Sequence, residues 1–385
     1  RRPQSVVGRW RERLPTPHCG AMTTTSGVLT LLSDTALREE IDRITAAVGT
    51  TPVHLDPGSR PGPRVWTAAG AVVVDEPSAV RLAATPLTRR SAVFVVVPGE
   101  PDGRSIDNAV LSASIAVGAE AVLALPGQAD QLVRALSRPA DHTGADGSGG
   151  RVAAVVGGRG GAGCSSFAAA MALRFSDTLL MDLDPYGGGI DLLLGAESAE
   201  GLRWPDIQVS EGRLSWPTVR QALPRQREVS VLSGSRRAYD IQPAAVEAFV
   251  EAARLAGVTV VCDLSNAHTD AARTALEVAD LVVVVAPCDI RSCAATAARV
   301  PALDALNPNV GLVVRGPAPG GLGSAEFAGV VGLPLLAAMR PEPMLAERLE
   351  HGGLRLGARS PLGRAAQRVL DVLVGGRSAD SGRAA

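Results

Sequence analysis

After residue 26 the chain alternates short apolar runs with polar, Ala-rich stretches. Two of the runs, 71–74 and 92–97, are apolar at every position, which is typical of strands in a sheet that is covered on both faces. The predicted strands are 28–32, 52–55, 71–74, 92–97 and 121–125, and the predicted helices are 35–48, 105–117 and 128–136. Strands and helices that alternate in this order predict a flavodoxin-like α/β unit over residues 27–139.

A second alternating pattern follows a polar, glycine-rich segment. Residues 140–150 are small and polar, so they predict a flexible linker. Beyond them the apolar runs predict a mainly parallel sheet in a second domain, over residues 151–375. Its predicted strands are 151–156, 178–185, 257–264, 281–286, 310–314 and 333–336, with a helix at 167–175. We expect residues 1–26 to be a disordered extension, with Met22 as an alternative start, and residues 376–385 to be a disordered tail.

The segment between the strand at 151–156 and the helix at 167–175 has the spacing of a phosphate-binding loop. The run Gly158-Arg159-Gly160-Gly161-Ala162-Gly163-Cys164-Ser165 fits G-x-x-x-x-G-K-[ST] everywhere except at the lysine, which is Cys164. In such a loop the glycine amides and the helix N-terminus bind an anion, the lysine reaches the β- and γ-phosphates, and the hydroxyl binds Mg²⁺. The predicted nucleotide-binding residues are Gly158, Arg159, Gly160, Gly161, Ala162, Gly163, Cys164, Ser165 and Ser166.

The missing lysine is not replaced by another lysine, because all 38 basic residues of the chain are arginines. The abundance of Ala, Arg and Gly indicates GC-biased coding, which explains an arginine at position 159. It does not explain the uncharged Cys164, so we interpret this change as loss of the catalytic cation. Removing one stabilising donor costs on the order of 10²–10³ in rate. We therefore expect weak binding of ATP and Mg²⁺ with little or no hydrolysis, as in a pseudo-ATPase.

Carboxylates end two further strands of the predicted sheet. Asp182 and Asp184 lie at the end of one, and Asp263 ends another in the Walker B pattern, where an Asp holds Mg²⁺ through water. Together with the hydroxyl of Ser165, Asp263 makes the predicted magnesium site.

The strand order of the first domain resembles that of a response-regulator receiver. Asp75 ends the third strand, where a receiver carries its phosphoacceptor, and Asp34 follows the first. Only one acid follows that first strand, however, and Pro126 and Gly127 stand where a receiver has its lysine. The Pro/Gly-rich segment 56–70 leaves little room for a second helix. We favour Asp75 as a turn cap over Asp75 as a phosphoacceptor, and predict a pseudo-receiver that is not phosphorylated.

The second domain resembles the ParA/MinD family of deviant Walker A ATPases. The segments that carry this resemblance are the loop at 159–165, the run Leu-Asp-Pro-Tyr-Gly-Gly-Gly-Ile-Asp-Leu-Leu-Leu-Gly at 183–195, the run Ala-Pro-Cys-Asp-Ile-Arg at 286–291, and Arg-Pro-Glu-Pro at 340–343. Among two-domain members with a receiver-like N-terminus, the pattern is similar to the pilus-assembly protein CpaE and to the actinobacterial septum site-determining protein, Ssd. The resemblance covers residues 27–375.

The resemblance implies roles for individual residues. The family's signature lysine, which crosses a dimer interface to the partner's phosphates, falls on Arg159, and the ordinary loop lysine falls on Cys164. The magnesium hydroxyl falls on Ser165. The acids that order the attacking water and the metal shell fall on Asp182 or Asp184, and the Walker B acid on Asp263. Many members have an Asn for adenine after the sixth strand, where this chain has Arg315-Gly316-Pro317.

Several residues allow a second interpretation. A thiol at a helix N-terminus, such as Cys164, is redox-reactive when its pKa is lowered, but we favour a small neutral filler. Gly187–Gly189 predicts a turn rather than another phosphate site. Arg236 and Arg237 are candidates for DNA-phosphate contacts, although a solvated loop pair is favoured. The periodic segment 362–373 lacks lysine and aromatic residues, so it predicts a fold-closing helix rather than a membrane-binding one.

Composition narrows the classes of partner. A net charge of −1 argues against a general polyanion-binding surface, and five cysteines without a C-x-x-C pair are typical of a reducing compartment. No apolar run reaches the ~20 residues that span a bilayer, and the first residues do not resemble a signal peptide. We predict a cytosolic protein that is at most peripheral to the inner face of the membrane.

The resemblance implies a regulator of septum placement or of Tad/Flp pilus secretion, which uses its P-loop domain as a scaffold or weak ATP-sensing switch. The implied partners are a second copy of the chain and division or pilus-secretion proteins. Two alternatives stay open. One is an active ATPase that dimerises on ATP, with Arg159 acting in trans, and the other is a nonspecific DNA-surface binder.

Overall fold

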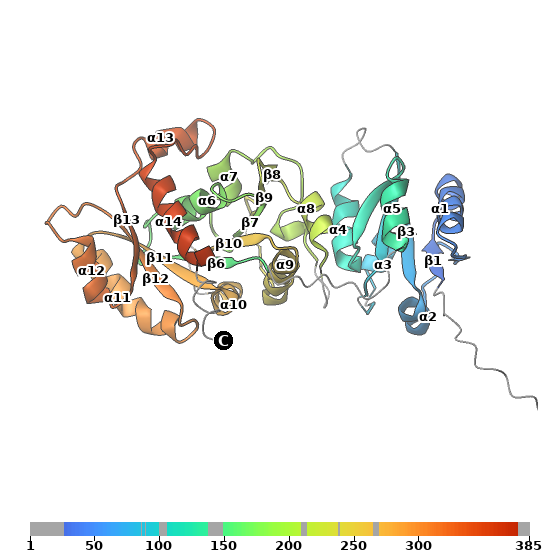
Figure 1. The fold of residues 1–385 in the computed structure, drawn as a ribbon, viewed down its shortest axis with the longest axis horizontal. Helices are drawn as coiled ribbons and strands as arrows, with labels where there is room; N and C mark the ends of the chain where they lie inside the picture. Colours follow the sequence, from blue (N-terminus) through green and yellow to red (C-terminus); the bar gives the residue numbers. More distant parts are fainter. Residues whose placement is uncertain are drawn as a thin grey trace, which may run out of the picture.

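The computed structural model describes residues 27–85, 87–88, 90–99, 106–137, 149–208, 214–237, 239–264 and 269–375, which form two α/β units (Figure 1). The extension predicted at 1–26, the tail predicted at 376–385 and most of the linker predicted at 140–150 lie outside these residues.

The N-terminal unit is a five-stranded sheet in the order β2-β1-β3-β4-β5, in which all neighbouring strands are parallel. Its elements are β1 (Val28–Leu31), α1 (Thr35–Ala47), β2 (Pro52–His54), α2 (Pro63–Ala68), β3 (Ala71–Asp75), α3 (Glu76–Ala83), β4 (Val93–Gly99), α4 (Asn108–Val117), β5 (Ala121–Pro126) and α5 (Ala129–Leu136). This strand order is the flavodoxin-like one, so the predicted fold class is confirmed for this unit.

The segment between β2 and β3 holds a helix that the sequence left little room for. Helix α2 begins with Pro63, a residue that suits the first turn because its missing N–H would have no helical partner there. Trp66 is buried, and its indole Nε1 donates a hydrogen bond to the carbonyl of Thr88 at 2.8 Å. One large buried side chain therefore anchors this helix of six residues. The sequence did not predict the helix because the segment is rich in Pro and Gly.

The C-terminal unit is an eight-stranded sheet in the order β13-β12-β11-β6-β10-β7-β9-β8, parallel except for the edge strand β8. Its strands are β6 (Val152–Gly157), β7 (Thr178–Asp182), β8 (Arg225–Gln226), β9 (Val229–Leu232), β10 (Thr259–Leu264), β11 (Leu281–Pro287), β12 (Val310–Arg315) and β13 (Leu335–Met339). Its helices are α6 (Cys164–Ala172), α7 (Ile190–Leu194), η1 (Trp204–Asp206), α8 (Trp216–Ala222), α9 (Pro243–Leu255), α10 (Asp270–Val278), α11 (Ile290–Asp304), α12 (Ser324–Val331), α13 (Leu345–Glu350) and α14 (Pro361–Gly375). The predicted mainly parallel sheet is confirmed.

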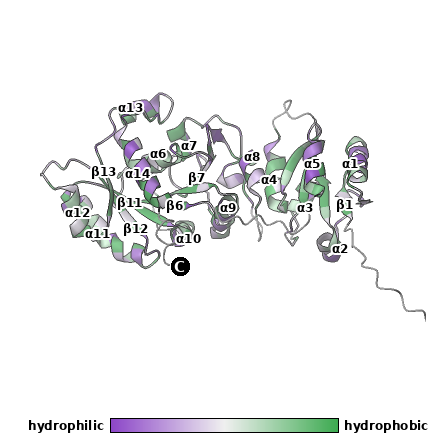
Figure 2. Cartoon of the chain, viewed as in Figure 1, coloured by the Kyte–Doolittle hydropathy of each residue, from purple (hydrophilic) through white to green (hydrophobic). Residues whose placement is uncertain are grey.

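Helices cover both faces of this sheet, and its central strands β6 and β11 carry no polar side chain. Along β6, Ala153 and Val155 face the core that contains α6 and α14, while Ala154 and Val156 face the opposite core. Figure 2 shows the central strands coloured hydrophobic, between helices that carry purple on their outer sides. Helix α14 packs against α6 and β13, which confirms the fold-closing helix predicted at 362–373.

The two units contact each other through α4 and the turn that follows it on one side, and α8 on the other (Figure 1). The hydroxyl of Thr218 donates to the buried carbonyl of Ala119 at 2.7 Å, and that of Ser215 donates to the carbonyl of Glu120 at 2.7 Å. Ser112 on α4 donates to the carbonyl of Asp206 at 2.6 Å. Buried apolar residues of α4 and α8 belong to one continuous core. The receiver-like unit is therefore fixed to the P-loop unit.

Thr218→Val is expected to lower the free energy of unfolding by about 1 to 2 kcal/mol, because it leaves a buried carbonyl without its donor while keeping side-chain shape. Chemical denaturation of the full chain measures this change. Thr67→Val, which removes an exposed hydroxyl on α2, is the matched control and should change stability much less. Equal effects of the two substitutions would contradict the importance of this contact.

Candidate nucleotide site

The loop between β6 and α6 has the backbone of an anion-binding loop. Gly161 and Gly163 have positive φ angles of 71° and 96°, which only glycine adopts without strain. A Cβ added to Gly158 would lie 2.1 Å from Oγ1 of Thr296, so this position also requires glycine. Helix α6 begins at Cys164, directly after the loop, so the loop amides and the helix N-terminus face the same space.

A cavity of about 450 Å³ opens over this loop. The predicted site residues that line it are Arg159, Gly161, Ala162, Gly163, Cys164, Ser165, Ser166, Asp182, Asp184 and Asp263. The turn Gly187–Gly189 lines it as well. Gly158 and Gly160 lie in the loop without lining the cavity. The structure thus brings the acids of β7 and β10 to the phosphate loop, because the carboxyl ends of parallel strands meet at one edge of a sheet.

Asp182 organises the turn beside the loop. Its Oδ1 accepts from the amide of Asp184 at 3.1 Å, and its Oδ2 accepts from the amide of Ile190 at 2.9 Å. The indole Nε1 of Trp204 in η1 donates to the backbone carbonyl of Asp182 at 2.6 Å. Burial raises the pKa of Asp182 to about 6, against the lowering effect of the amide donors. Both carboxylate oxygens already have backbone partners.

Asp263 differs from Asp182 in having a carboxylate oxygen without a hydrogen-bond partner among the described residues. It is 2% exposed, it lies next to the Ser165 side chain, and its Oδ1 is the oxygen that lacks a partner in the described part of the chain. Burial, together with the nearby charges of Asp182 and Asp184, raises its pKa to about 7, against the lowering effect of the Ser165 side chain. A buried oxygen without a partner next to a hydroxyl is a donor pair that fits Mg²⁺.

The protein alone does not complete a metal shell. Within the described residues no group of three or more His, Cys, Asp or Glu side chains is placed to hold a metal ion. Mg²⁺ generally keeps several waters and binds through one or two protein oxygens together with phosphate oxygens. Ser165 and Asp263 would therefore hold it only together with a bound nucleotide, where it would neutralise phosphate charge.

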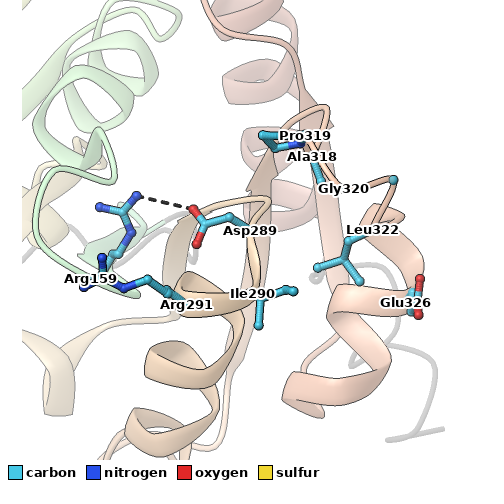
Figure 3. Close-up of a pocket in the computed structure, with 10 residues that line it drawn as sticks. Arg159, Asp289, Ile290, Arg291, Ala318, Pro319, Gly320, Leu322 and Glu326 are labelled. Carbon is cyan, nitrogen blue, oxygen red and sulfur yellow. Dashed lines mark hydrogen bonds and ion pairs between the residues drawn. The ribbon is translucent and has the colours of Figure 1, made fainter.

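Arg159 is turned toward its own chain (Figure 3). Its Nε donates to Oγ of Ser292 at 2.6 Å, and its terminal nitrogen lies 3.3 Å from Oδ2 of Asp289. The backbone and side-chain donors of Ser292, with Arg159, hold the pKa of Asp289 below its ordinary value. Arg159 also lines a second, larger opening of about 840 Å³ beside α11 and the segment 318–322. Arg159, which the resemblance assigns to a partner's phosphates, is therefore bonded to Ser292 and Asp289 of its own chain.

Cys164 brings no charge to the loop. Its side chain is buried, and burial raises the pKa of its thiol to about 12. A thiol with this pKa stays protonated at pH 7, which argues against the redox-reactive alternative. The four cysteines among the described residues (Cys164, Cys262, Cys288 and Cys293) are free and buried.

Two arginines that the sequence did not assign to the site approach the loop. Arg299 on α11 donates to the carbonyl of Gly157 at 2.6 Å, and Arg315 at the end of β12 lies 3.5 Å from the carbonyl of Gly161. The resemblance marks Arg315 only as standing at the position of an Asn after the sixth strand. No spacing in the sequence links either residue to the loop.

Arg236 pairs with a buried carboxylate, although its own side chain is 46% exposed. Asp191 on α7 is 1% exposed and pairs with Arg203 at 3.3 Å and with Arg236 at 3.1 Å, while Ser233 donates to it at 3.0 Å. Both Arg236 and Arg237 are exposed, as expected of a solvated loop pair, and Arg236 also pairs with the buried Asp191.

Asp75 serves as the N-cap of α3. Its Oδ1 accepts from the amide of Ser78 at 3.0 Å, and its Oδ2 accepts from the amide of Ser33. The carboxylate is 2% exposed. Both oxygens therefore have backbone donors, and the side chain is enclosed rather than open to a phosphodonor.

The stability of the free chain is expected to fall as pH rises from about 4 to 7. A carboxyl whose folded-state pKa is raised binds more protons folded than unfolded, so folding loses free energy as pH passes from the ordinary value of 3.8 toward about 7 for Asp263. Unfolding in the absence of Mg²⁺ and nucleotide should show a loss of about 2 to 4 kcal/mol, most of which Asp263→Asn removes. Exposed Asp304→Asn should keep the wild-type profile; a flat wild-type profile would contradict the assignment.

Comparison with known proteins agrees with this architecture. Residues 31–147 match a family model described as "Rv3660c-like, CheY-like N-terminal domain". Two proteins of Mycobacterium tuberculosis, named Rv3660c (strain H37Rv) and MT3760 (strain CDC 1551), are each 53% identical over 355 residues, which cover 92% of this chain and 100% of theirs. Among solved structures, a ParA family ATPase from Chlorobium tepidum TLS aligns with a TM-score of 0.50 at 17% identity, covering 56% of this chain and 96% of that one. At that identity the match shows the fold alone. Within the described residues, no helix is long and apolar enough to cross a membrane.

Proposed function

We propose that this chain, which belongs to the family of the Mycobacterium tuberculosis protein Rv3660c, is a regulator. Its ParA-type P-loop unit senses a nucleotide without turning it over. The observation that supports this most directly is the cavity over the phosphate loop. It keeps the amides, the hydroxyl and the acids of a nucleotide site, and it has an uncharged, buried Cys164 in place of the loop cation.

Nucleotide binding is supported by the parts of the site that do not depend on a lysine. The loop glycines and the start of α6 offer amides to an anion, as helix N-termini and glycine-rich loops do in general. Ser165 and the free oxygen of Asp263 offer donors for Mg²⁺. These groups bind and orient the phosphates, and Mg²⁺ would supply charge neutralisation when bound.

Loss of turnover is supported by the state of the charged groups. Phosphoryl transfer depends mainly on positioning and on positive charge at the transferred group. Cys164 is neutral, Arg159 is paired with Asp289 in its own chain, and Asp182 has both oxygens engaged by backbone amides. The resulting loss is expected to be at least on the order of 10²–10³ in rate.

The cellular role that the resemblance favours is placement of the division septum or of a Tad/Flp pilus secretion apparatus, through division or secretion proteins that bind this scaffold. A deletion strain complemented with the wild type or with Ser165→Ala tests this role. Altered septum spacing that the wild type corrects and Ser165→Ala does not would support nucleotide-dependent septum placement. Normal septa with loss of surface pili would support the secretion role, and a strain unaffected in both would contradict the proposal.

An active ATPase that dimerises with Arg159 in trans is the second candidate, and one observation favours it. The Arg159–Asp289 pair is partly exposed, with side chains 42% and 33% accessible, and such pairs are worth only about 0 to 1 kcal/mol. Arg159 can therefore exchange Asp289 for a partner's phosphates at little cost. Sedimentation with MgATP tests this: an ATP-dependent dimer that Arg159→Ala and Asp263→Ala both abolish would support the active enzyme.

The DNA-binding alternative is weakened by the structure. Arg236, one of its two candidate cations, is committed to the buried Asp191. Salt-dependent DNA binding that Arg237→Ala abolishes would be needed to revive this alternative.

A further inference from the structure

Arg315 lies beside the phosphate loop although it is far from it in the sequence. It ends β12, which pairs with β11, and β11 pairs with β6, the strand that leads into the loop. One terminal nitrogen of its guanidinium lies 3.5 Å from the carbonyl of Gly161. The other would lie 3.1 Å from a Cβ added to Gly163, so the absence of a side chain at Gly163 makes room for this arginine.

Arg315 differs from the other arginines at the loop in the partners that it has. Arg159 pairs with Asp289, and Arg299 makes a short bond of 2.6 Å to the carbonyl of Gly157. Arg315 forms no ion pair within the described part of the chain, and its contact with Gly161 is long. A guanidinium has five N–H donors and no acceptor, so most of its donors remain for an anion.

The guanidinium of Arg315 lies beside Gly161 and Gly163, next to Cys164, where the loop cation is missing. Its charge, like that of Arg299, opposes the burial that raises the pKa of the Cys164 thiol. An arginine without a carboxylate partner next to an anion-binding loop has phosphate as its natural partner, because its planar fork binds phosphate oxygens through two parallel hydrogen bonds.

We propose that Arg315 supplies, from β12 of the same chain, the phosphate-binding cation that the loop lacks at Cys164, and that its ligand is the phosphate chain of the nucleotide. This inference rests on the proposed nucleotide-sensing function. It assigns to Arg315 a binding role, and it explains how a loop without a lysine retains affinity for a polyphosphate.

The test uses the full chain and two probes, MgADP and inorganic tripolyphosphate, each titrated by calorimetry. Arg315→Ala is expected to weaken binding of both probes about tenfold or more, as loss of a charge-assisted hydrogen bond does. Arg315→Gln, which keeps the length without the charge, should give a similar loss. Arg273→Ala removes one positive charge from an exposed pair on α10 and should bind as the wild type does. Adding Cys164→Lys to Arg315→Ala should restore affinity, because it returns a cation to the loop.

The outcomes separate this inference from the function on which it rests. If the wild type binds both probes and Arg315→Gln binds them equally well, the inference is wrong while nucleotide sensing stands. If the wild type binds neither probe, nucleotide sensing itself is wrong. If Arg315→Ala does not fold, affinity is measured for Arg315→Gln and for Arg315→Gln combined with Cys164→Lys. A loss in the first variant that the second restores supports the role of Arg315, and an unchanged affinity in Arg315→Gln contradicts it.

Discussion

Cys164→Lys is expected to bind MgATP about ten- to a hundredfold more tightly than the natural chain, because a charge-assisted contact to phosphate is worth about 1.5 to 3 kcal/mol. Cys164 is the first residue of α6, where a lysine side chain would reach back over the loop amides. The buried thiol now at this position is neutral at pH 7 because burial raises its pKa to about 12. The substitution therefore places a positive charge at a loop position that now has none.

Calorimetry with MgATP and a phosphate-release assay on the same protein measure this gain. Cys164→Ser, which keeps the size and adds no charge, is the matched control and should bind as the natural chain does. Phosphate release should also become measurable in Cys164→Lys if the acids are still positioned for chemistry. Unchanged affinity would show that the loop no longer has a phosphate-binding shape.

Asp191→Ala is expected to lower the free energy of unfolding by about 3 to 5 kcal/mol, because it leaves a buried positive charge without its partner. Asp191 is 1% exposed and Arg203 is 15% exposed, so water does not replace the lost carboxylate at Arg203. Ser233 and Arg236 lose their acceptor in the same substitution. This cluster joins α7, which borders the nucleotide cavity, to the segment that leads into η1.

Urea denaturation of the full chain measures the loss. Asp270→Ala, which breaks the exposed pair with Arg273 on α10, is the control, and it should cost less than about 1 kcal/mol. If Asp191→Ala lowers the free energy of unfolding no more than Asp270→Ala does, the ion pairs of Asp191 stabilise the fold no more than exposed pairs do.

The strands and the loop followed from the sequence because their signals are local. Continuous apolar runs predicted strands such as β4 and β11, and glycine spacing predicted the loop whose positive φ angles at Gly161 and Gly163 require glycine. The acids Asp182 and Asp263 followed from their places at strand ends, because parallel strands bring those ends together.

The remaining features depend on contacts between distant segments, which no local pattern encodes. Helix α2 forms because Trp66 is buried against the segment around Thr88, a contact across 22 residues. Arg159 pairs with Asp289 and Arg315 reaches Gly161 only because β11 lies beside β6 and β12 lies beside β11 in the folded sheet. Asp191 lies in the run at 183–195, where no local pattern indicates that it pairs with Arg203 and Arg236.

MgATP calorimetry paired with a phosphate-release assay on one preparation of the natural chain decides whether this site binds a nucleotide without turning it over. We expect a measurable heat of binding that Asp263→Ala reduces, with no release of phosphate above the background of that variant. Phosphate release by the natural chain that Asp263→Ala abolishes would instead identify a working ATPase.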